Sequence, residues 1–481
     1  MSPEQAVIVI GSGLAGLCAT TQLIAHRIPV IMLERAAKPG GNSIKASSGI
    51  NGAPTRFQPP LQNDSADLFL ADTLSSAGRP LASSVAEERA RRERLISTLV
   101  TTSSEAVSWL VDEKGVDLST VAQLGGHSRA RTHRGGAGQK PPGYAIVSAL
   151  LDSLNQEPLF ELRTNTRVTR VVRAEGDSDD TEGMLGVEYD AGREDNQTET
   201  LYGPLIFATG GFAGDTHGLL EKYRPDLAGI PSTNEAREGT QPLLEEVGAE
   251  VVDMDQVQVH PTGFVDEKDL TAPVKFLAAE ALRGEGGILL VGEGKRFVDE
   301  LDTREKVTAA VMKGAGPLED TSRRQWDVTL LLDEGAAAAS NTHLGFYLWK
   351  GLMRKTTVGE LALPSIRDTL QDYAEVVSGK KPDDFGRSSF GNWTLKDVRS
   401  DSVVYVGRVT PVVHFTMGGV VINEHSQVLD KSGSPIKGLW AAGEITGGLH
   451  GQNRLGGSSL LECVVFGRIA GENAAAFHQQ H

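Results

Sequence analysis

The chain has 481 residues, of which 39% are hydrophobic and 23% are charged, and its formal net charge at pH 7 is −16. This length exceeds what one hydrophobic core usually organises, so we expect two domains. The acidic balance disfavours nucleic acids and anionic membrane surfaces as partners, because both attract basic patches. With only Cys18 and Cys463, the sequence excludes a disulfide framework and a covalently attached haem.

The first elements predicted in chain order form a nucleotide-binding unit. The apolar run at residues 7–10 ends in a glycine-rich turn, Gly11-Ser12-Gly13-Leu14-Ala15-Gly16. A helix follows at 14–25, and a second buried strand at 30–33 ends at Glu34. A carboxylate about 20 residues after such a turn accepts hydrogen bonds from ribose hydroxyls. The pattern therefore predicts a Rossmann-like βαβ unit that binds a dinucleotide.

Further segments along the chain are suited to line that cofactor. The loop at 40–51 consists mostly of small and polar residues, and two buried strands, predicted at 205–209 and 439–442, run into glycines. Between about 160 and 202, alternating residues predict a small antiparallel meander. Its acidic turns, at 175–182 and 193–195, are expected to be solvated.

The segment at 450–461 predicts a binding site for a small anion. Arg454 lies between His450 and a Gly456-Gly457 turn that enters an apolar helix. A guanidinium beside the free N–H groups of a helix start is suited to hold a carboxylate. A dinucleotide site and an anion site in one chain suggest a flavin enzyme that acts on a carboxylate.

Four other segments concentrate polar side chains, but each has an ordinary explanation when taken singly. His260 precedes a proline and could be a turn residue, Glu280 and Arg283 could be a surface helix pair, and Arg304 could be solvated. The four segments span residues 259–263, 279–284, 296–304 and 410–419.

Together with the 40–51 and 450–461 segments, these four segments resemble the soluble fumarate reductases of fungi and trypanosomatids over nearly the whole chain. They are more distantly similar to the flavin subunits of bacterial flavocytochrome c fumarate reductases and of succinate dehydrogenase. The resemblance implies an α/β fold with a Rossmann-like FAD-binding domain and an inserted α+β clamp domain. The FAD-binding domain would comprise residues 1–255 and 415–481, and the clamp domain residues 256–414.

The resemblance also implies how an alkene acid is reduced by hydride from N5 of reduced FAD. Arg304 would donate the proton, and Glu280 and Arg283 would resupply it. The hydride builds negative charge on the substrate, and a positioned cation stabilises such charge. The expected catalytic residues are Arg304, His260, Glu280 and Arg283, and the expected substrate-binding residues are His260, Glu280, His414, Arg454 and Gly457.

The FAD is expected to be noncovalent. The 40–51 loop has Ser43 and no histidine, whereas the succinate dehydrogenase flavin subunit attaches FAD through a histidine in the matching loop. The chain departs from the family at 237–242, where Arg-Glu-Gly-Thr-Gln-Pro stands in place of a Thr-Gly-Asp-Gly motif, and at Ala279, where some bacterial relatives have threonine. The expected cofactor-binding residues are Gly11, Ser12, Gly13, Ala15, Gly16, Glu34, Arg35, Gly41, Asn42, Ser43, Ser47, Ser48, Gly49, Val168, Gly210, Glu444, Ser459 and Leu460.

The expected activity is reduction of fumarate to succinate, without a metal. Alternatives are reduction of another unsaturated acid such as mesaconate, oxidation of aspartate on a similar scaffold, and a flavin-binding protein without catalysis. Electrons are expected from a diffusible reduced flavin or an unidentified donor, because two cysteines are too few for an iron–sulfur cluster. We expect a cytoplasmic protein, since the first five residues carry an acid and no base and no run of 18 apolar residues occurs. A mitochondrial location stays open if a targeting peptide precedes this chain.

Overall fold

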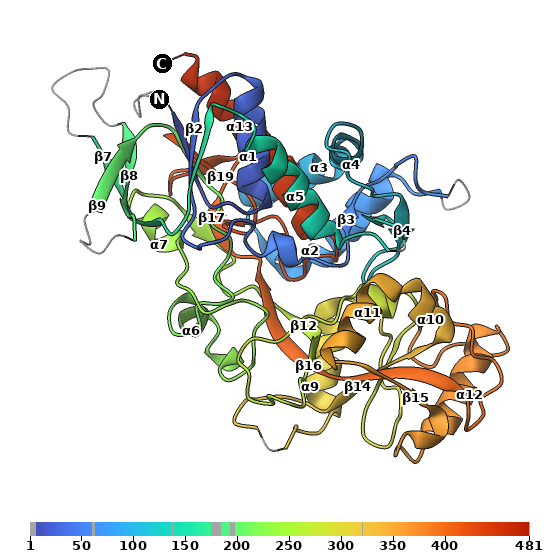
Figure 1. Cartoon of the computed structure of the whole chain (residues 1–481). Coiled ribbons are helices and arrows are strands. Elements are labelled where there is room, and N and C mark those ends of the chain that lie inside the picture. Colours follow the sequence, from blue (N-terminus) through green and yellow to red (C-terminus); the bar gives the residue numbers. More distant parts are fainter. Residues whose placement is uncertain are drawn as a thin grey trace.

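A computed structural model describes residues 6–59, 63–136, 138–174, 184–192, 198–319 and 321–480. The first five residues and the predicted acidic turns at 175–182 and 193–195 lie outside the described residues. Figure 1 shows two bodies, one of which contains both ends of the chain. The other body consists of the yellow and orange elements and joins the first through the long strand β16 (Val403–Thr416).

The body with both chain ends is built on a six-stranded sheet of order β18-β19-β10-β1-β2-β6. All neighbouring strands are parallel except the edge pair β18 and β19. The strand at residues 7–10 is apolar throughout because it is fully buried. The six strands are β1 (Val7–Ile10), β2 (Val30–Leu33), β6 (Phe160–Arg163), β10 (Leu205–Phe207), β18 (Gln427–Leu429) and β19 (Pro435–Ala441).

The predicted meander begins later than the sequence indicated. Residues 160–163 form β6, which pairs in parallel with β2 and places Phe160 opposite Val30. A four-residue strand carries no signal that selects its partner, so the assignment of these residues to the meander was wrong. The meander itself comprises β7 (Arg167–Arg173), β8 (Leu185–Asp190) and β9 (Thr198–Tyr202).

Two helices from opposite ends of the chain pack together beside this sheet. They are α1 (Leu14–Ala25) and α13 (Ser458–His478), which lie side by side in Figure 1. A Cβ atom added to Gly467 would lie 2.5 Å from the carbonyl oxygen of Ala15, and one added to Gly471 would lie 2.4 Å from that of Ala19. The two glycines therefore allow a close crossing that a larger residue would prevent.

The second body is an α+β unit around a five-stranded sheet. Its core continues into residues that precede 256, because Phe212 and Leu227 pack in the same cluster as Val307 and Val413. The boundaries at 256 and 414 therefore stay a prediction. The unit contains β12 (Val257–Phe264), β13 (Ile288–Leu290), β14 (Val328–Asp333), β15 (Arg354–Thr357), β16, α8 (Ala281–Gly284), α9 (Arg304–Gly314), α10 (Glu334–Ala339), α11 (Asn341–Lys350) and α12 (Ile366–Val377).

The remaining elements complete a mixed α/β structure, as the sequence predicts. No helix within the described ranges has both the length and the hydrophobicity that a bilayer crossing requires. The other helices are α2 (Ala66–Ser83), α3 (Ala86–Thr101), α4 (Ser103–Asp112), α5 (Pro142–Leu154), α6 (Leu219–Tyr223) and α7 (Gln241–Glu245), and the short strands are β3 (Ile50–Asn51), β4 (Thr120–Ala122), β5 (Thr132–Arg134), β11 (Val251–Val252), β17 (Gly419–Val421) and β20 (Thr446–Gly447).

Candidate functional site

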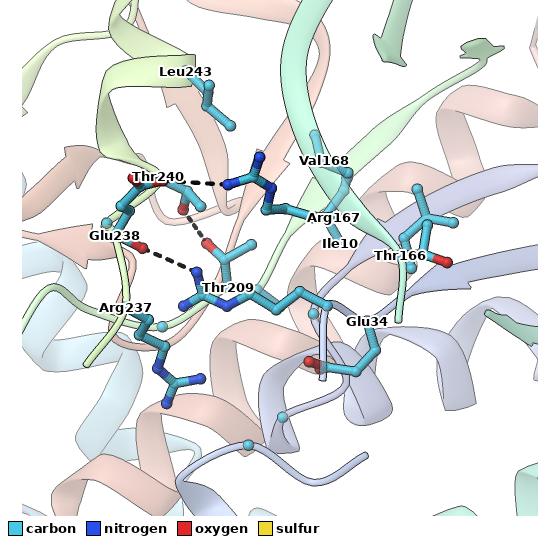
Figure 2. Close-up of a pocket in the computed structure, with 18 of the residues that line it drawn as sticks. Ile10, Glu34, Thr166, Arg167, Val168, Thr209, Arg237, Glu238, Thr240 and Leu243 are labelled. Carbon is cyan, nitrogen blue, oxygen red and sulfur yellow. Dashed lines mark hydrogen bonds and ion pairs between the residues drawn. The ribbon is translucent and has the colours of Figure 1, made fainter. Parts of the chain in front are cut away.

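A cavity of about 250 Å³ opens where strands β1, β2 and β10 end. The carboxyl ends of parallel strands are where open α/β sheets bind nucleotides. Figure 2 shows Glu34 on one side of this cavity, with Glu238 and Thr240 across from it. The predicted cofactor residues that line it are Gly11, Gly13, Glu34, Arg35, Gly41, Asn42, Val168 and Gly210.

The glycine-rich turn packs directly against the residue that follows β10. Gly11 has a φ of +102°, and a Cβ atom there would lie 2.4 Å from the carbonyl oxygen of Ala208. Glu34 accepts hydrogen bonds from the Ser12 N–H at 3.0 Å, the Ser12 hydroxyl at 2.5 Å and the Ala36 N–H at 2.8 Å. The carboxylate is thus fixed at the strand end. This geometry fits the adenosine part of a dinucleotide.

The other predicted cofactor residues do not line this cavity. Ser43 Oγ accepts a hydrogen bond from Leu14 N–H at 3.2 Å, and the Ser47 carbonyl contacts Nε2 of His343 at 2.6 Å. Glu444 accepts from Thr416 N–H at 3.0 Å, and burial raises its pKa to about 7. The set comprises Ser12, Ala15 and Gly16 at the first turn, Ser43, Ser47, Ser48 and Gly49 in the 40–51 loop, Glu444 after β19, and Ser459 and Leu460 in α13.

The sequence analysis missed part of the cavity wall. Arg237, Glu238, Gly239 and Thr240 line the cavity, so the segment that departs from the family motif faces this site. Glu238 accepts a hydrogen bond from Arg35 Nη1 at 3.1 Å through its carbonyl oxygen. The departure of residues 237–242 from the family motif was the signal that could have indicated this segment, although it could not show which site the segment faces.

A second group of polar side chains collects around the start of α9. Thr303 caps this helix by accepting the Lys306 N–H at 3.4 Å, which makes Arg304 the first helical residue. A cation at this end of a helix is opposed by the helix dipole. Glu280 compensates, because its Oε2 lies 2.5 Å from Nη2 of Arg304 and 2.6 Å from Nε. Nη2 of Arg283 lies 4.0 Å from the same oxygen.

Two β-bulges direct the histidines into this group. The pairing of β12 with β16 skips His414, and a second irregularity follows His260. Such bulges re-aim side chains. The two rings consequently face each other at a centroid distance of 5.3 Å. The Thr233 hydroxyl lies 3.0 Å from Nδ1 of His414.

The imidazole of His260 is a neutral hydrogen-bond donor. Its Nδ1 accepts the Thr262 N–H at 3.2 Å, so the ring proton must be on Nε2. That nitrogen is buried without a partner. Burial, and then the charge of Arg304, holds the pKa of both His260 and His414 well below the usual value. Both rings are therefore uncharged near neutral pH.

The buried charges leave the group cationic. Burial alone would raise the pKa of Glu280, but the adjacent Arg304 and Arg283 lower it to about 2. Burial, reinforced by Arg304, lowers the pKa of Arg454 to about 9. The buried guanidiniums of Arg283, Arg304 and Arg454 and the buried carboxylate of Glu280 thus carry a net charge of +2. That charge matches a dicarboxylate.

Several donors in this group have no hydrogen-bond partner. They include Nε of Arg454 and Nε and Nη2 of Arg283. Burying an unpaired donor costs about 1–3 kcal/mol, so these atoms favour a ligand that supplies acceptors. Arg454 is held in place for such contact, because its guanidinium stacks 4.3 Å from the centre of the Phe415 ring and Nη1 donates to the Leu455 carbonyl.

Gln258 joins the two predicted arginines and was missed. Its Oε1 accepts from Nη1 of Arg304 at 2.9 Å, and its Nε2 donates to the carbonyl of Arg454 and to Oδ1 of Asn453, both at 3.0 Å. Its position two residues before His260 in a strand was the signal that could have found it.

The predicted anion segment is divided between two surroundings. Gly457 lies at the start of α13 with a φ of +81°, next to Asn51. Gly456 packs against Glu280, since a Cβ atom there would lie 2.9 Å from its Oε2. His450 instead bonds to Glu462 within the body that holds both chain ends. Within the described residues, no cluster of His, Cys, Asp or Glu is arranged to hold a metal ion.

Known proteins match the chain over nearly its full length. Residues 6–460 match the family described as FAD binding domain. The chain is 43% identical to "Fumarate reductase 1" of Saccharomyces cerevisiae over 98% of both proteins, and 41% identical to "Fumarate reductase" of Schizosaccharomyces pombe over 98% of this chain and 89% of that protein. It is 33% identical to "NADH:fumarate oxidoreductase" of Klebsiella pneumoniae, of which it spans 47%.

A solved structure shows the same architecture. The open conformation of a flavocytochrome c3 fumarate reductase superposes with a TM-score of 0.72 at 30% identity, covering 99% of this chain and 79% of that one. These matches confirm the predicted resemblance, the Rossmann-like fold with its second α+β domain, and FAD as the cofactor. The chain therefore belongs to the FAD binding domain family, together with the fumarate reductases of both yeasts.

Proposed function

We propose that the protein reduces fumarate to succinate at the cationic group around Arg304. The observation that carries the proposal is a buried cluster of net charge +2 whose donors lack partners. A small dianion would satisfy both the charge and the hydrogen bonds. The two yeast relatives are named as fumarate reductases, which supports fumarate as that dianion.

The FAD would be held by residues around the 250 Å³ cavity and along the 40–51 loop. Glu34 would bind the ribose, and the start of α1 would face the pyrophosphate. When bound, FAD supplies the hydride. Residues 1–255 and 415–481 would form the FAD-binding domain and 256–414 the clamp.

The side chains of the cationic group would divide the remaining work. Arg454 would bind one carboxylate of the substrate, with His260 and His414 donating to carboxylate oxygens. An N–H proton of Arg304 would move to the alkene carbon that does not receive the hydride. Arg283 would then transfer a proton to the ionised carboxylate of Glu280, Glu280 would transfer it to the deprotonated Arg304, and solvent water would restore the proton of Arg283.

Reoxidation of the reduced protein tests the activity directly. Protein reduced under anaerobic conditions should regain its oxidised flavin absorbance when fumarate is added. Return of the absorbance with mesaconate but not with fumarate would favour the alternative substrate. Oxygen uptake with aspartate would favour an oxidase instead, and no response to any acid would favour a protein without catalysis.

The flavin is expected to be released completely by acid. The loop at 40–51 offers Ser43 and no histidine for covalent attachment. Precipitation of the yellow protein with acid should leave all flavin in the supernatant, where its absorbance is measured. Yellow colour that stays with the washed pellet would contradict noncovalent binding.

Reduced free flavins are expected to be better electron donors than NADH. We see one glycine-rich turn with a following acid, and the relative named for NADH has about half its length outside the match. Reduced FMN, reduced FAD or a reduced viologen should support turnover. Rapid fumarate reduction by purified protein with NADH alone would show that a nucleotide site was missed. We also propose that the electron donor is diffusible and that the protein is cytoplasmic.

A further inference from the structure

A loop outside the predicted motifs contacts both halves of the cationic site. The backbone N–H of Gly125 donates to Oε1 of Glu280 at 2.7 Å. Two residues later, Nε2 of His127 lies 2.9 Å from the carbonyl oxygen of Gly456. Both contacts are buried. The loop therefore lies against the proposed relay carboxylate and the glycine turn at once.

Arg131 determines which nitrogen of His127 carries the proton. Its Nη1 lies 3.3 Å from Nδ1 of His127, and a guanidinium can only donate. Nδ1 must therefore accept, so Nε2 carries the hydrogen that is donated to Gly456. Arg131 is itself fixed, because Asp64 accepts two of its hydrogen bonds at 3.0 and 2.8 Å and Asp72 accepts a third at 2.5 Å.

The imidazole stays neutral in this surrounding. Burial, together with the charge of Arg131, lowers the pKa of His127 to about 4. A neutral ring with a fixed tautomer has one hydrogen to donate and one fixed direction in which to donate it. The acceptor, the carbonyl of Gly456, also receives Nδ2–H of Asn51 at 2.8 Å.

We propose that His127 is a positioning residue that fixes the Gly456-Gly457 turn against Glu280 and the substrate carboxylate. The inference rests on the proposed function, because the turn is placed there as part of the substrate site. Gly456 lies too close to Glu280 to admit even a Cβ atom. A small shift of the turn would therefore disturb both the carboxylate contact and the relay. Misplacement by about 1 Å can cost on the order of 100-fold in rate.

Three variants separate positioning from packing. His127→Leu keeps a side chain of similar bulk without the donor, and His127→Gln restores an N–H at the end of the side chain. The matched control is His133→Leu, which removes another buried imidazole and its 2.8 Å contact with the Thr55 hydroxyl but leaves both donors to the Gly456 carbonyl, His127 and Asn51, in place. The pKa of His133 is likewise lowered to about 4 by burial.

The variants are compared by FAD content, by kcat and KM for fumarate with reduced viologen, and by the Kd of succinate from flavin absorbance. We expect kcat/KM of His127→Leu to be about 100-fold lower than that of the parent. We expect kcat/KM of His127→Gln to be at least about tenfold higher than that of His127→Leu. His133→Leu should stay within about threefold of the parent, and all should keep FAD.

The succinate measurement tests the inference even if the parent does not reduce fumarate. His127→Leu should weaken succinate binding by about tenfold, while His133→Leu should leave it unchanged. Equal losses of succinate affinity in His127→Leu and His133→Leu would overturn the inference. The inference would also be overturned if His127→Gln lost as much affinity as His127→Leu. An inactive parent with the expected succinate pattern would reject the proposed function alone.

Discussion

Arg304→Ala is expected to abolish fumarate reduction while leaving FAD bound. The guanidinium is proposed to act as the proton donor, so its removal raises the barrier of the chemical step. A general acid contributes on the order of 100- to 10,000-fold, and we expect a loss of at least 1,000-fold in kcat. The change also leaves Glu280 with a longer ion pair, to Arg283 at 4.0 Å. Turnover is measured with a reduced viologen, and FAD by absorbance.

Two further substitutions make the Arg304 result specific. Arg304→Lys should keep a trace of activity at most, because an ammonium cannot contact Glu280 and Gln258 with the geometry of the guanidinium. Arg408→Ala is the control within the same body, since Arg408 forms a half-exposed pair with Asp327 at 3.1 Å. If Arg304→Ala kept turnover within about tenfold of the parent, about 1.4 kcal/mol of barrier, Arg304 would not be the donor.

Arg454→Ala is expected to weaken substrate binding and to lower turnover as well. A bidentate guanidinium both holds and orients a carboxylate, and the free Nε of Arg454 is available for that contact. A charge-assisted hydrogen bond contributes about 1.5–3 kcal/mol, so KM should rise by roughly 10- to 100-fold. The effect is measured by steady-state kinetics over a range of fumarate concentrations.

The histidines provide the comparison for this second variant. His260→Ala and His414→Ala should each reduce activity less than Arg304→Ala, because they remove neutral donors and leave the charge of the site unchanged. If Arg454→Ala lost FAD but kept its apparent affinity for fumarate, Arg454 would be a cofactor contact.

Local sequence was enough to predict the nucleotide-binding unit. The strand at 7–10, the glycine turn and Glu34 lie within one short stretch, and each feature constrains its neighbours. The partner of residues 160–163 could not be predicted, because any of several strands could have accepted so short a segment of alternating apolar and charged residues. Strand pairing there is decided by the packing of the whole sheet.

The cationic group could be assembled only through the family resemblance. Taken singly, His260 could be a turn residue and Arg304 a solvated side chain, and nothing in the local sequence indicates that either approaches Arg454. His127 contacts a carbonyl 329 positions away, and Gln258 acts through its amide on residues up to 196 positions away. Neither His127 nor Gln258 lies in a motif that the sequence analysis could have used. Their roles follow from tertiary contacts alone.

The crossing of α1 with α13 has a consequence for how the protein is made. Strand β19 and helix α13 are synthesised after the second body, yet β19 completes the parallel sheet and α13 packs against α1. During translation, one edge of the sheet that carries the glycine-rich turn stays unpaired while the second body is synthesised. That body has all its strands between 257 and 416 and can fold beforehand. Chain connectivity therefore places the completion of the six-stranded sheet after the synthesis of the second body.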